Sequence, residues 1–455
     1  MAERQLFGTD GIRGVANERL TPQLAMQLGQ AAAAVLASEH SRPRVLIAKD
    51  TRQSCDMLEA ALAAGFSSAG CDVELLGVLP TPALAWLVKS GDVQLGAMIS
   101  ASHNPARDNG IKLFSATGSK LSDATEVQIE QGLQHPERLT TACQAITGDR
   151  VGRIVPRDTT AAMQPYLEAL TQYVSTDLSH LKVALDTAHG AMYKVAPAAF
   201  KALGIEASVL FASPDGMNIN LNCGSTHLEA LQEYVKANGL DLGIAFDGDG
   251  DRCLLVGPEG QVLDGDQILY LCSRYLPAYA KEQAVVATVM SNLGLEKALK
   301  QQNRTLLRTA VGDRYVLETM HKENHLLGGE QSGHVIFGDI QVTGDGLLTA
   351  LQTLQAIALS GKPLSELLSQ MQLFPQLLKN VVVESHWQRH WQDHEGFQVE
   401  IAAAEAALED TGRLLIRASG TEPKLRVMAE GEDQNLVTAT VDRLVAYIQR
   451  EMVTA

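Results

Sequence analysis

The chain of 455 residues is long enough for three or four domains, and its 45% hydrophobic and 20% charged residues are typical of a globular protein with a sizeable core. Its formal net charge of −16 argues against a nucleic-acid-binding protein, because the phosphate backbone requires a basic surface. The same charge repels anions, so an anionic substrate would need a local basic site.

Short β-branched runs alternate with longer helical runs, a pattern that predicts layered α/β units. Thr21-Pro22 is typical of a helix start. In the first part we expect helices over 21–39 and 57–69 and strands over 45–48, 73–76 and 95–100. The pattern restarts with strands over 182–186, 207–211, 242–246 and 284–290 and helices over 192–203, 228–238, 293–301 and 345–360.

These restarts predict three similar α/β domains over residues 1–150, 151–255 and 256–370. The stretch Leu373–Leu378, which contains Pro375, is interpreted as a linker. A smaller α+β domain is expected over 375–455, because its order differs: strands over 381–384, 413–417 and 426–430, and helices over 399–408 and 436–450.

Neither a membrane span nor a secretory signal is expected. No apolar run approaches the ~20 residues that a spanning helix needs, and the N-terminus lacks the basic-then-apolar order of a signal peptide. The six cysteines form no CxxC pair and no zinc-like spacing with histidine, which favours idle thiols in a reducing compartment. We therefore expect a cytoplasmic protein.

The first segment that can carry chemistry is SASHNP at 100–105, directly after a predicted strand. Loops at the carboxyl ends of strands are where α/β sheets bind ligands. Ser102 is a candidate nucleophile or phosphate carrier. From this segment alone, a role for Ser102 and Asn104 as caps of a following helix is equally favoured.

The second segment, DGDGDR at 247–252, follows the predicted strand over 242–246. Asp247, Asp249 and Asp251 alternate with glycines that permit a tight turn, so their oxygens can converge on one hard cation such as Mg²⁺. An EF-hand is excluded, because a strand follows and no glutamate stands at the twelfth position. An acidic hairpin turn is the remaining alternative.

The third and fourth segments supply polar groups. GEQSGH at 329–334 presents Glu330, Ser332 and His334 from a glycine-flanked loop suited to sugar hydroxyls, with His334 able to move a proton, although a polar surface turn is an equal alternative. RASGTEPKLR at 417–426 combines hydroxyls and arginines around a turn, which suits a phosphate. It lacks the pattern of a nucleotide P-loop.

Weaker candidates are Arg13, in GTDGIRG, and Lys112, in NGIK, either of which could stabilise charge on a transferring phosphoryl group. Each is more often a solvated surface charge. His386, His390 and His394 recur every four residues and could share a helix face, but an exposed helical edge is favoured over a metal site.

Taken together, the ordered segments FGTDGIRG, SASHNP, DGDGDR, GEQSGH and RASGTEPKLRV resemble the α-D-phosphohexomutase superfamily over nearly the whole chain. Within it, the opening motif, the form of the serine segment, CGSTHLE at 223–229 and TAVGDRYV at 309–316 are similar to the branch that acts on glucosamine phosphates. Relatives that act on glucose or mannose phosphates more often differ there. The resemblance implies four domains: three α/β domains with mixed sheets and a smaller α+β domain.

The resemblance implies that the chain interconverts glucosamine 6-phosphate and glucosamine 1-phosphate, through a phosphoserine enzyme and a hexosamine 1,6-bisphosphate, for amino-sugar and cell-wall precursor synthesis. Ser102 would carry the phosphoryl group, and one Mg²⁺ would be held by Ser102, Asp247, Asp249 and Asp251. The substrate-binding residues would be Glu330, Ser332, Arg252, Arg417, Ser419, Gly420, Thr421 and Arg426. His334, Arg13 and Lys112 would be acid/base or electrostatic helpers.

The expected partner is a small phosphosugar, with neither nucleic acid nor membrane, and a homodimer is the candidate assembly. Cys55, His189 and Ala310 stand where relatives usually have glycine, asparagine and lysine. The competing hypotheses are a phosphomannomutase/phosphoglucomutase activity and a catalytically silent sugar-phosphate sensor. The intact serine and aspartates argue against the sensor.

Overall fold

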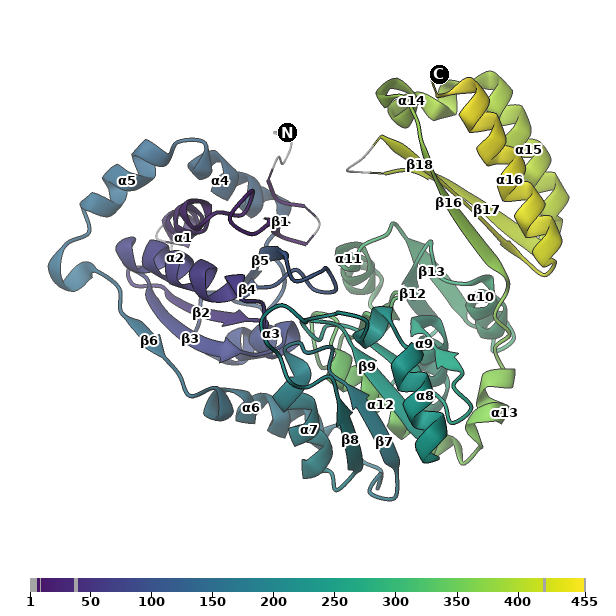
Figure 1. Cartoon of the computed structure of the whole chain (residues 1–455), viewed down its shortest axis with the longest axis horizontal. Coiled ribbons are helices and arrows are strands. Elements are labelled where there is room, and N and C mark those ends of the chain that lie inside the picture. The colour runs from purple at the N-terminus through teal and green to yellow at the C-terminus, as the bar shows by residue number, and fades with distance from the viewer. Residues whose placement is uncertain (1–5, 9, 37–39, 420–422, 454–455) are drawn as a thin grey trace.

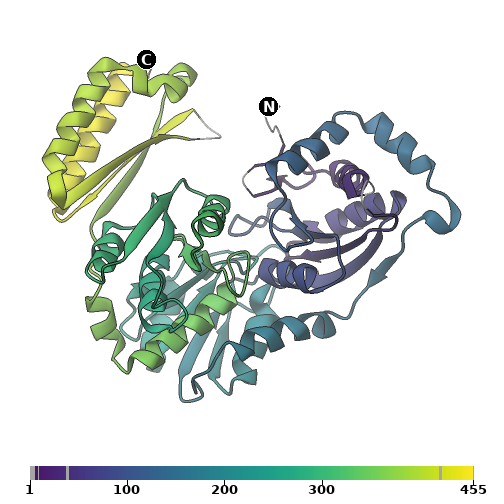
Figure 2. The same cartoon turned by 180° about the vertical axis from the view of Figure 1, so that it is seen from behind.

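The computed structural model describes residues 6–8, 10–36, 40–419 and 423–453. Strands in these ranges form sheets of six, five, four and three strands, one after another along the chain. Figure 1 shows three α/β domains arranged along an arc and a smaller C-terminal domain that stands apart, attached beside the third; Figure 2 shows the same arrangement from behind. The predicted architecture of three α/β domains and a smaller α+β domain is confirmed.

The first domain is built on the six-stranded sheet. Its elements are β1 (Ile12–Val15), α1 (Pro22–Leu36), β2 (Arg44–Lys49), α2 (Ser54–Ser68), β3 (Asp72–Val78), α3 (Thr81–Ser90), β4 (Leu95–Ile99), β5 (Asp108–Ser115), α4 (Asp123–Leu133), α5 (Pro136–Gln144), a 3-10 turn at Gly148–Arg150 and β6 (Ile154–Pro156). The strand order is β1-β5-β4-β2-β3-β6, with β5 antiparallel to both of its neighbours. Central strand β2 is buried on both faces: Val45 and Ile47 pack with α1 and α2, while Leu46 and Ala48 belong to the core around α3.

The second domain repeats this arrangement on five strands. Its elements are α6 (Thr159–Gln172), β7 (Lys182–Asp186), α7 (Met192–Ala202), β8 (Glu206–Leu210), a 3-10 turn at Gly224–Thr226, α8 (Glu229–Asn238), β9 (Leu242–Phe246), β10 (Cys253–Val256) and β11 (Val262–Leu263). The order is β11-β10-β9-β7-β8, with β7, β8 and β9 parallel. The loop after β9 therefore leaves the carboxyl edge of a parallel unit, where ligands bind in such sheets.

The third domain has four strands, in the order β13-β12-β14-β15. Its elements are α9 (Gly265–Tyr275), β12 (Ala284–Thr288), α10 (Leu293–Lys300), β13 (Thr305–Thr309), α11 (Asp313–Glu323), β14 (Leu327–Gly329), β15 (Val335–Phe337), α12 (Gly346–Ser360) and α13 (Leu364–Ser369). Only the β14–β15 pair is antiparallel, so its connecting turn lies at the same edge as the carboxyl ends of β12 and β14.

The fourth domain is an antiparallel sheet covered by helices. Its elements are β16 (Gln376–Val382), α14 (Ser385–His390), a 3-10 turn at Trp391–Asp393, α15 (Glu395–Leu408), a 3-10 turn at Glu409–Thr411, β17 (Gly412–Ala418), β18 (Lys424–Gly431) and α16 (Gln434–Glu451). Strand β18 lies between the other two. In Figure 1 the two long helices cover one face, and the β17–β18 hairpin points toward the N-terminal domain.

The first three domains share one hydrophobic core, whereas the fourth domain has its own. One cluster of buried side chains runs through the first three sheets and includes Phe114, Phe246 and Phe337, one residue from each. The fourth domain has a separate cluster, which includes Phe397 and Leu425. Because the first three domains bury apolar surface against one another, their loops can be held in fixed register at a shared site.

Two predictions about the C-terminal part are wrong. The stretch interpreted as a linker is partly a strand, since β16 begins directly after Pro375; proline can precede a strand although it cannot donate within one. The three histidines do not share one helix, because α14 ends at His390 and His394 instead caps α15, where its ring accepts the amide of Phe397.

Sheet membership also bears on the domain boundaries, which remain predictions. Strand β6 pairs with β3, and β11 pairs with β10, so both segments belong to the sheet that precedes them in the chain. The pairing favours boundaries after Pro156 and Leu263 over boundaries at 150 and 255. Among the described helices, none combines the length and apolar character that crossing a bilayer requires.

Candidate active site

Ser102 lies in the serine loop (residues 100–107), which links β4 to β5. The residue is 1% exposed and has a left-handed backbone, with φ of 53°. Its hydroxyl donates a hydrogen bond of 2.6 Å to Asp247 Oδ2 in the second domain. A strand follows this loop, so the alternative in which Ser102 and Asn104 cap a helix is wrong.

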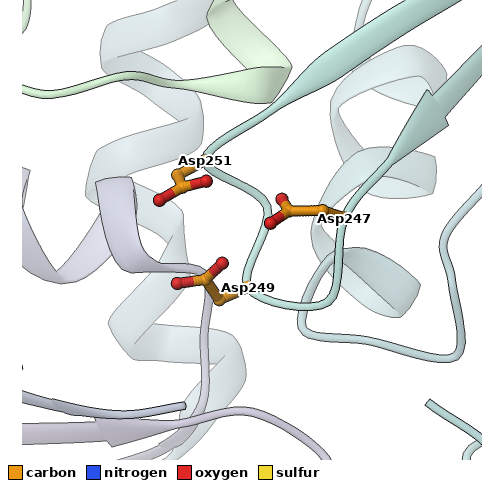
Figure 3. A group of neighbouring side chains, drawn as sticks. All are labelled: Asp247, Asp249 and Asp251. Atoms are coloured by element: carbon orange, nitrogen blue, oxygen red, sulfur yellow. The ribbon is translucent and has the colours of Figure 1, made fainter. Parts of the chain in front are cut away.

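The aspartate loop (residues 247–252) follows β9 and places three carboxylates around one space (Figure 3). One oxygen from each of Asp247, Asp249 and Asp251 lies within 4.8 Å of the others. Gly248 permits this placement, because a Cβ there would lie 2.5 Å from the carbonyl oxygen of Ser102. The backbones of the serine loop and the aspartate loop are thus in direct contact.

The aspartate trio fits a metal cofactor. Oδ1 of Asp249 and Oδ1 of Asp251 are buried and accept no hydrogen bond from the described part of the chain. Burial, followed by the charges of Asp251 and Asp249, raises the pKa of Asp247 well above its ordinary value. Three hard oxygen donors with unsatisfied lone pairs and mutual repulsion suit a divalent cation such as Mg²⁺.

Lys112, on β5, is the cation nearest to the trio. Its Nζ lies 2.7 Å from Asp249 Oδ2, 3.4 Å from Asp251 Oδ2 and 3.2 Å from Asp10 Oδ2. Burial lowers its pKa, but these three carboxylates outweigh burial and raise it well above the ordinary value. A buried lysine in this setting keeps its charge, so Lys112 supplies fixed positive potential at the site.

Arg13 reaches the site through Asp10. The two side chains form an ion pair, and the buried Arg13 Nε has no hydrogen-bond partner among the described residues. Asp10 also pairs with Lys120, at 2.6 Å, and Lys120 in turn lies 2.7 Å from Asp313 at the start of α11. These ion pairs join the first domain to the third. Asp10 and Asp313 stand in the FGTDGIRG and TAVGDRYV motifs without having been singled out, whereas Lys120 lies outside every motif.

His334 comes from the GEQSGH loop (residues 329–334) between β14 and β15. Its Nδ1 lies 3.6 Å from Asp251 Oδ1, and its Nε2 lies 3.5 Å from Asp313 Oδ2. Burial lowers the pKa of His334, but Asp251 and then Asp313 raise it to about 9. The amide of Gly344 lies 3.1 Å from Nε2 and can donate to it only when that nitrogen carries no proton. This contact therefore favours the neutral ring, whereas Asp251 and Asp313 favour the charged one.

Glu330 and Ser332 lie on the same turn. Gly333 has φ of 88°, and a Cβ there would lie 2.2 Å from the Cys253 carbonyl oxygen, so glycine is required. Glu330 Oε1 accepts the amide of Gly312 at 3.2 Å, and the buried Ser332 Oγ has no hydrogen-bond partner within residues 6–8, 10–36, 40–419 and 423–453. The Gly312 contact explains why the TAVGDRYV segment belongs to the site.

Arg252 completes the group from the first three domains. Its backbone amide donates to Asp247 Oδ1 at 3.1 Å, and its Nε lies 3.9 Å from Asp251 Oδ1. The Nε is buried and makes no hydrogen bond in the part of the chain that the structure describes. The structure therefore brings Ser102, the aspartates, Lys112, Arg252 and His334 together, with Arg13 linked through Asp10.

The remaining candidates lie on the fourth domain, in the hairpin between β17 and β18. Arg417 and Arg426 are directly paired across the two strands, and Arg417 Nε makes no hydrogen bond to any residue that the structure describes. Burial and the charge of Arg426 lower the pKa of Arg417. Ser419 is buried and its amide donates to Lys424 O, while Gly420 and Thr421 lie outside the described residues. Two adjacent arginines provide the charge and the donors that an anion-binding surface requires.

Four family models match the chain in order. They are the alpha/beta/alpha domains I, II and III of phosphoglucomutase/phosphomannomutase, at residues 4–139, 164–260 and 264–374, and the C-terminal domain of the same family, at residues 378–446. The four matches follow the four sheets.

Relatives are similar over the full length. The phosphoglucosamine mutase of Geobacillus thermodenitrificans is 48% identical over 448 residues, which covers 98% of each chain. That of Bacillus subtilis is 46% identical over 449 residues, with the same coverage. Both relatives therefore match nearly the whole chain rather than a single domain.

Solved structures share the fold. A phosphoglucomutase/phosphomannomutase family protein from Burkholderia thailandensis matches with a TM-score of 0.81 at 24% identity, covering 98% of this chain and 97% of that one. The Aspergillus fumigatus N-acetylphosphoglucosamine mutase, in complex with GlcNAc-6P and magnesium, matches with a TM-score of 0.66 at 17% identity, covering 98% and 96%.

Proposed function

This chain belongs to the phosphoglucomutase/phosphomannomutase family, and we infer that it catalyses the interconversion of glucosamine 6-phosphate and glucosamine 1-phosphate. It is an isomerase that transfers a phosphoryl group within its substrate. The observation that carries the mechanism is the contact between the Ser102 hydroxyl and Asp247, which joins a phosphate-carrying serine to the metal-binding aspartates.

In the forward direction, phosphorylated Ser102 transfers its phosphoryl group to the C1 hydroxyl of glucosamine 6-phosphate. The bond between Oγ and phosphorus breaks, and the products are free Ser102 and glucosamine 1,6-bisphosphate. The bisphosphate then reorients in the site, so that its 6-phosphoryl group reaches Ser102. This group moves to Ser102 Oγ, and glucosamine 1-phosphate leaves. The proton released from the sugar hydroxyl in the first step is replaced at the 6-hydroxyl in the second, so the cycle is balanced.

The aspartate trio would hold one Mg²⁺, with a phosphoserine oxygen as a further ligand. The ion would neutralise charge on the transferring phosphoryl group. Lys112 supplies a further positive charge beside the same aspartates, and its raised pKa makes it an electrostatic group rather than a base. His334, which touches Asp251, is the candidate to move the hydroxyl proton.

Glu330 and Ser332 would bind sugar hydroxyls, and Arg252 would bind the substrate nearby. Arg417, Ser419, Gly420, Thr421 and Arg426 would hold the phosphate that is not reacting. Because either phosphate of the bisphosphate must occupy this hairpin in turn, we expect it to recognise phosphate rather than sugar stereochemistry. A small phosphosugar is thus the partner, while a homodimer and a cytoplasmic location remain predictions from the sequence.

A substrate panel tests this function. We expect the purified enzyme, primed with a hexose 1,6-bisphosphate and Mg²⁺, to turn over glucosamine 6-phosphate with a higher kcat/KM than glucose or mannose phosphates. A higher value for mannose or glucose phosphate would favour a phosphomannomutase/phosphoglucomutase. Absence of turnover with all three, by protein carrying a phosphate on Ser102, would favour a sugar-phosphate sensor.

A further inference from the structure

Arg52 lies between β2 and α2, and its side chain is completely buried. All five of its N–H donors are used. Nε donates to Asp50 Oδ2 at 2.9 Å, and the two terminal nitrogens donate to carbonyl oxygens in or directly after the serine loop: Ser102 at 2.9 Å, Asn104 at 2.8 Å, Pro105 at 2.5 Å and Asp108 at 3.0 Å. One side chain thus fixes the backbone of the whole loop.

Asn220 holds the same loop from the second domain. Its side-chain amide donates to the carbonyl oxygens of Ser102, at 2.9 Å, and Asn104, at 3.0 Å. Each of these two oxygens therefore accepts one bond from Arg52 and one from Asn220, which saturates its lone pairs. We call this arrangement the carbonyl clamp: Arg52 and Asn220 with the carbonyls of Ser102 and Asn104.

The clamp acts on a strained residue. Ser102 has φ of 53°, a left-handed conformation that costs a residue other than glycine on the order of 1 kcal/mol. A second restraint comes from Ser100, whose hydroxyl accepts the Ser102 amide at 2.9 Å and donates to Asp50 at 2.6 Å. This conformation directs the Ser102 hydroxyl at Asp247, so its loss would turn the phosphate carrier away from the metal-binding carboxylates.

The charge of Arg52 is already neutralised. The Asp50–Arg52 ion pair is 2.9 Å long, and both side chains have 0% exposure. A neutral, fully bonded pair contributes little field at the reacting phosphorus, in contrast to Lys112. The contribution of Arg52 is therefore one of position rather than of charge.

The clamp also sets the spacing between domains. The position that a Cβ of Gly248 would take is 2.5 Å from the Ser102 carbonyl oxygen and 2.8 Å from Asn220 Nδ2. The clamped carbonyl thus rests directly on the backbone between Asp247 and Asp249. Any shift of the clamp moves Ser102 relative to the metal ligands.

We propose that Arg52 and Asn220 are positioning residues for phosphoryl transfer, which hold Ser102 against the aspartate loop from both domains at once. The proposal rests on the function proposed above. It implies that Ser102 and the metal-binding aspartates form one rigid unit during the cycle. The bisphosphate would therefore reorient while Ser102 stays in place.

Two matched pairs of variants test the clamp. Arg52→Lys keeps the charge beside Asp50 but removes the planar guanidinium that donates to several carbonyls at once. Its control is Arg304→Lys. Arg304 is likewise buried and donates to the carbonyls of Glu282, Ser273 and Tyr279 in the third domain. Asn220→Gly keeps the left-handed backbone but removes the amide. Its control is Asn303→Gly, at an exposed left-handed position with φ of 57°.

For the folded fraction of each variant, measured by circular dichroism, we expect Arg52→Lys and Asn220→Gly to lose about 100-fold in kcat with KM within about twofold. The controls should keep the wild-type kcat even where their melting temperature falls. Because both residues act on the same two carbonyls, the double variant should lose less than the product of the single losses.

A kcat of either clamp variant equal to that of its control, in an active wild-type background, would overturn the proposal. So would multiplicative losses in the double variant. If Arg52→Lys does not fold, the comparison of Asn220→Gly with its control Asn303→Gly tests the proposal by itself. An inactive wild-type enzyme would instead contradict the proposed function, so the two failures are distinguishable.

Discussion

Ser102 Oγ and Asp247 Oδ2 are 2.6 Å apart, although 145 positions separate the two residues in the chain. The bond joins the end of β4 in the first domain to the end of β9 in the second. When Ser102 carries a phosphoryl group, its hydroxyl proton is gone, and the two groups would repel each other unless a cation lay between them. The contact therefore places phosphorylated Ser102 where a divalent cation held by the aspartate trio would offset this repulsion.

Asp249→Asn tests the metal site. Asp249 accepts hydrogen bonds from Lys112, at 2.7 Å, and Thr81, at 2.5 Å, so an asparagine keeps the shape but removes a charged ligand. We expect the affinity for Mg²⁺, measured by isothermal titration calorimetry, to fall at least about 10-fold, and kcat at least about 100-fold. Asp177→Asn, at an exposed position, is the control. Wild-type Mg²⁺ affinity in Asp249→Asn would place the metal elsewhere.

Lys112→Met should lower the free energy of unfolding, and the size of this loss should depend on whether Mg²⁺ is present. The variant leaves Asp10, Asp249 and Asp251 without their shared cation, and an uncompensated buried charge costs about 3 kcal/mol or more. In urea unfolding with EDTA, we expect the free energy of unfolding to fall by about that amount, and by less with Mg²⁺ present. The exposed Lys300→Met serves as control. An equal loss with and without Mg²⁺ would separate Lys112 from the metal site.

Arg417→Ala tests the hairpin of the fourth domain. Removal of one of two adjacent arginines should raise KM for glucosamine 6-phosphate at least about 10-fold, because a charge-assisted bond to phosphate is lost. The melting temperature should stay near that of the wild type, since Arg417 is only partly buried. Arg450→Ala, an exposed arginine on α16 of the same domain, should leave KM unchanged. An unchanged KM in Arg417→Ala would show that the hairpin does not bind the phosphate.

The sequence predicts most of the regular elements, because their residues favour one structure locally. The strands predicted over 182–186 and 242–246 coincide with β7 and β9. Strand β5 is different: Asn109-Gly110 is typical of a turn, yet both residues lie in a buried strand whose partners β1 and β4 come from distant parts of the first domain. The histidine series fails for a similar reason, because spacing alone does not show where a helix ends.

The same limit applies to the site. Ser102, the aspartates and the arginine hairpin stand in local motifs whose composition indicates chemistry. Arg52 and Asn220 have no such signal, because each acts through backbone carbonyls that become neighbours only in the folded chain. Cys55, noted as a departure from relatives, donates a weak hydrogen bond of 3.2 Å to Asp50 and thus lies in the same network.

The stability of the third domain should depend on pH through Asp345. This buried residue caps α12 and accepts bonds of 2.9 and 2.8 Å from Tyr166. Burial raises its pKa to about 6, above the value of about 3.9 in an unfolded chain, so its contribution is fully present below pH 4 and is lost as the pH rises through 6.

Asp345→Asn keeps the capping oxygen and does not ionise. Relative to the wild type, its free energy of unfolding should rise by about 2 kcal/mol between pH 4.5 and pH 7.5, measured by urea unfolding at both values. A difference between variant and wild type that stays constant over this range would mean that Asp345 does not titrate there.

Phosphoryl transfer to Ser102 is the most direct test of the mechanism. The enzyme, first dephosphorylated and then incubated with glucosamine 1,6-bisphosphate and Mg²⁺, should gain about 80 Da in intact mass, with the phosphate located on Ser102 by peptide mapping. Ser102→Ala should gain no mass, and chelation of Mg²⁺ should prevent the gain in the wild type. A phosphate on another residue, or equal phosphorylation of Ser102→Ala, would contradict the role of Ser102 as carrier.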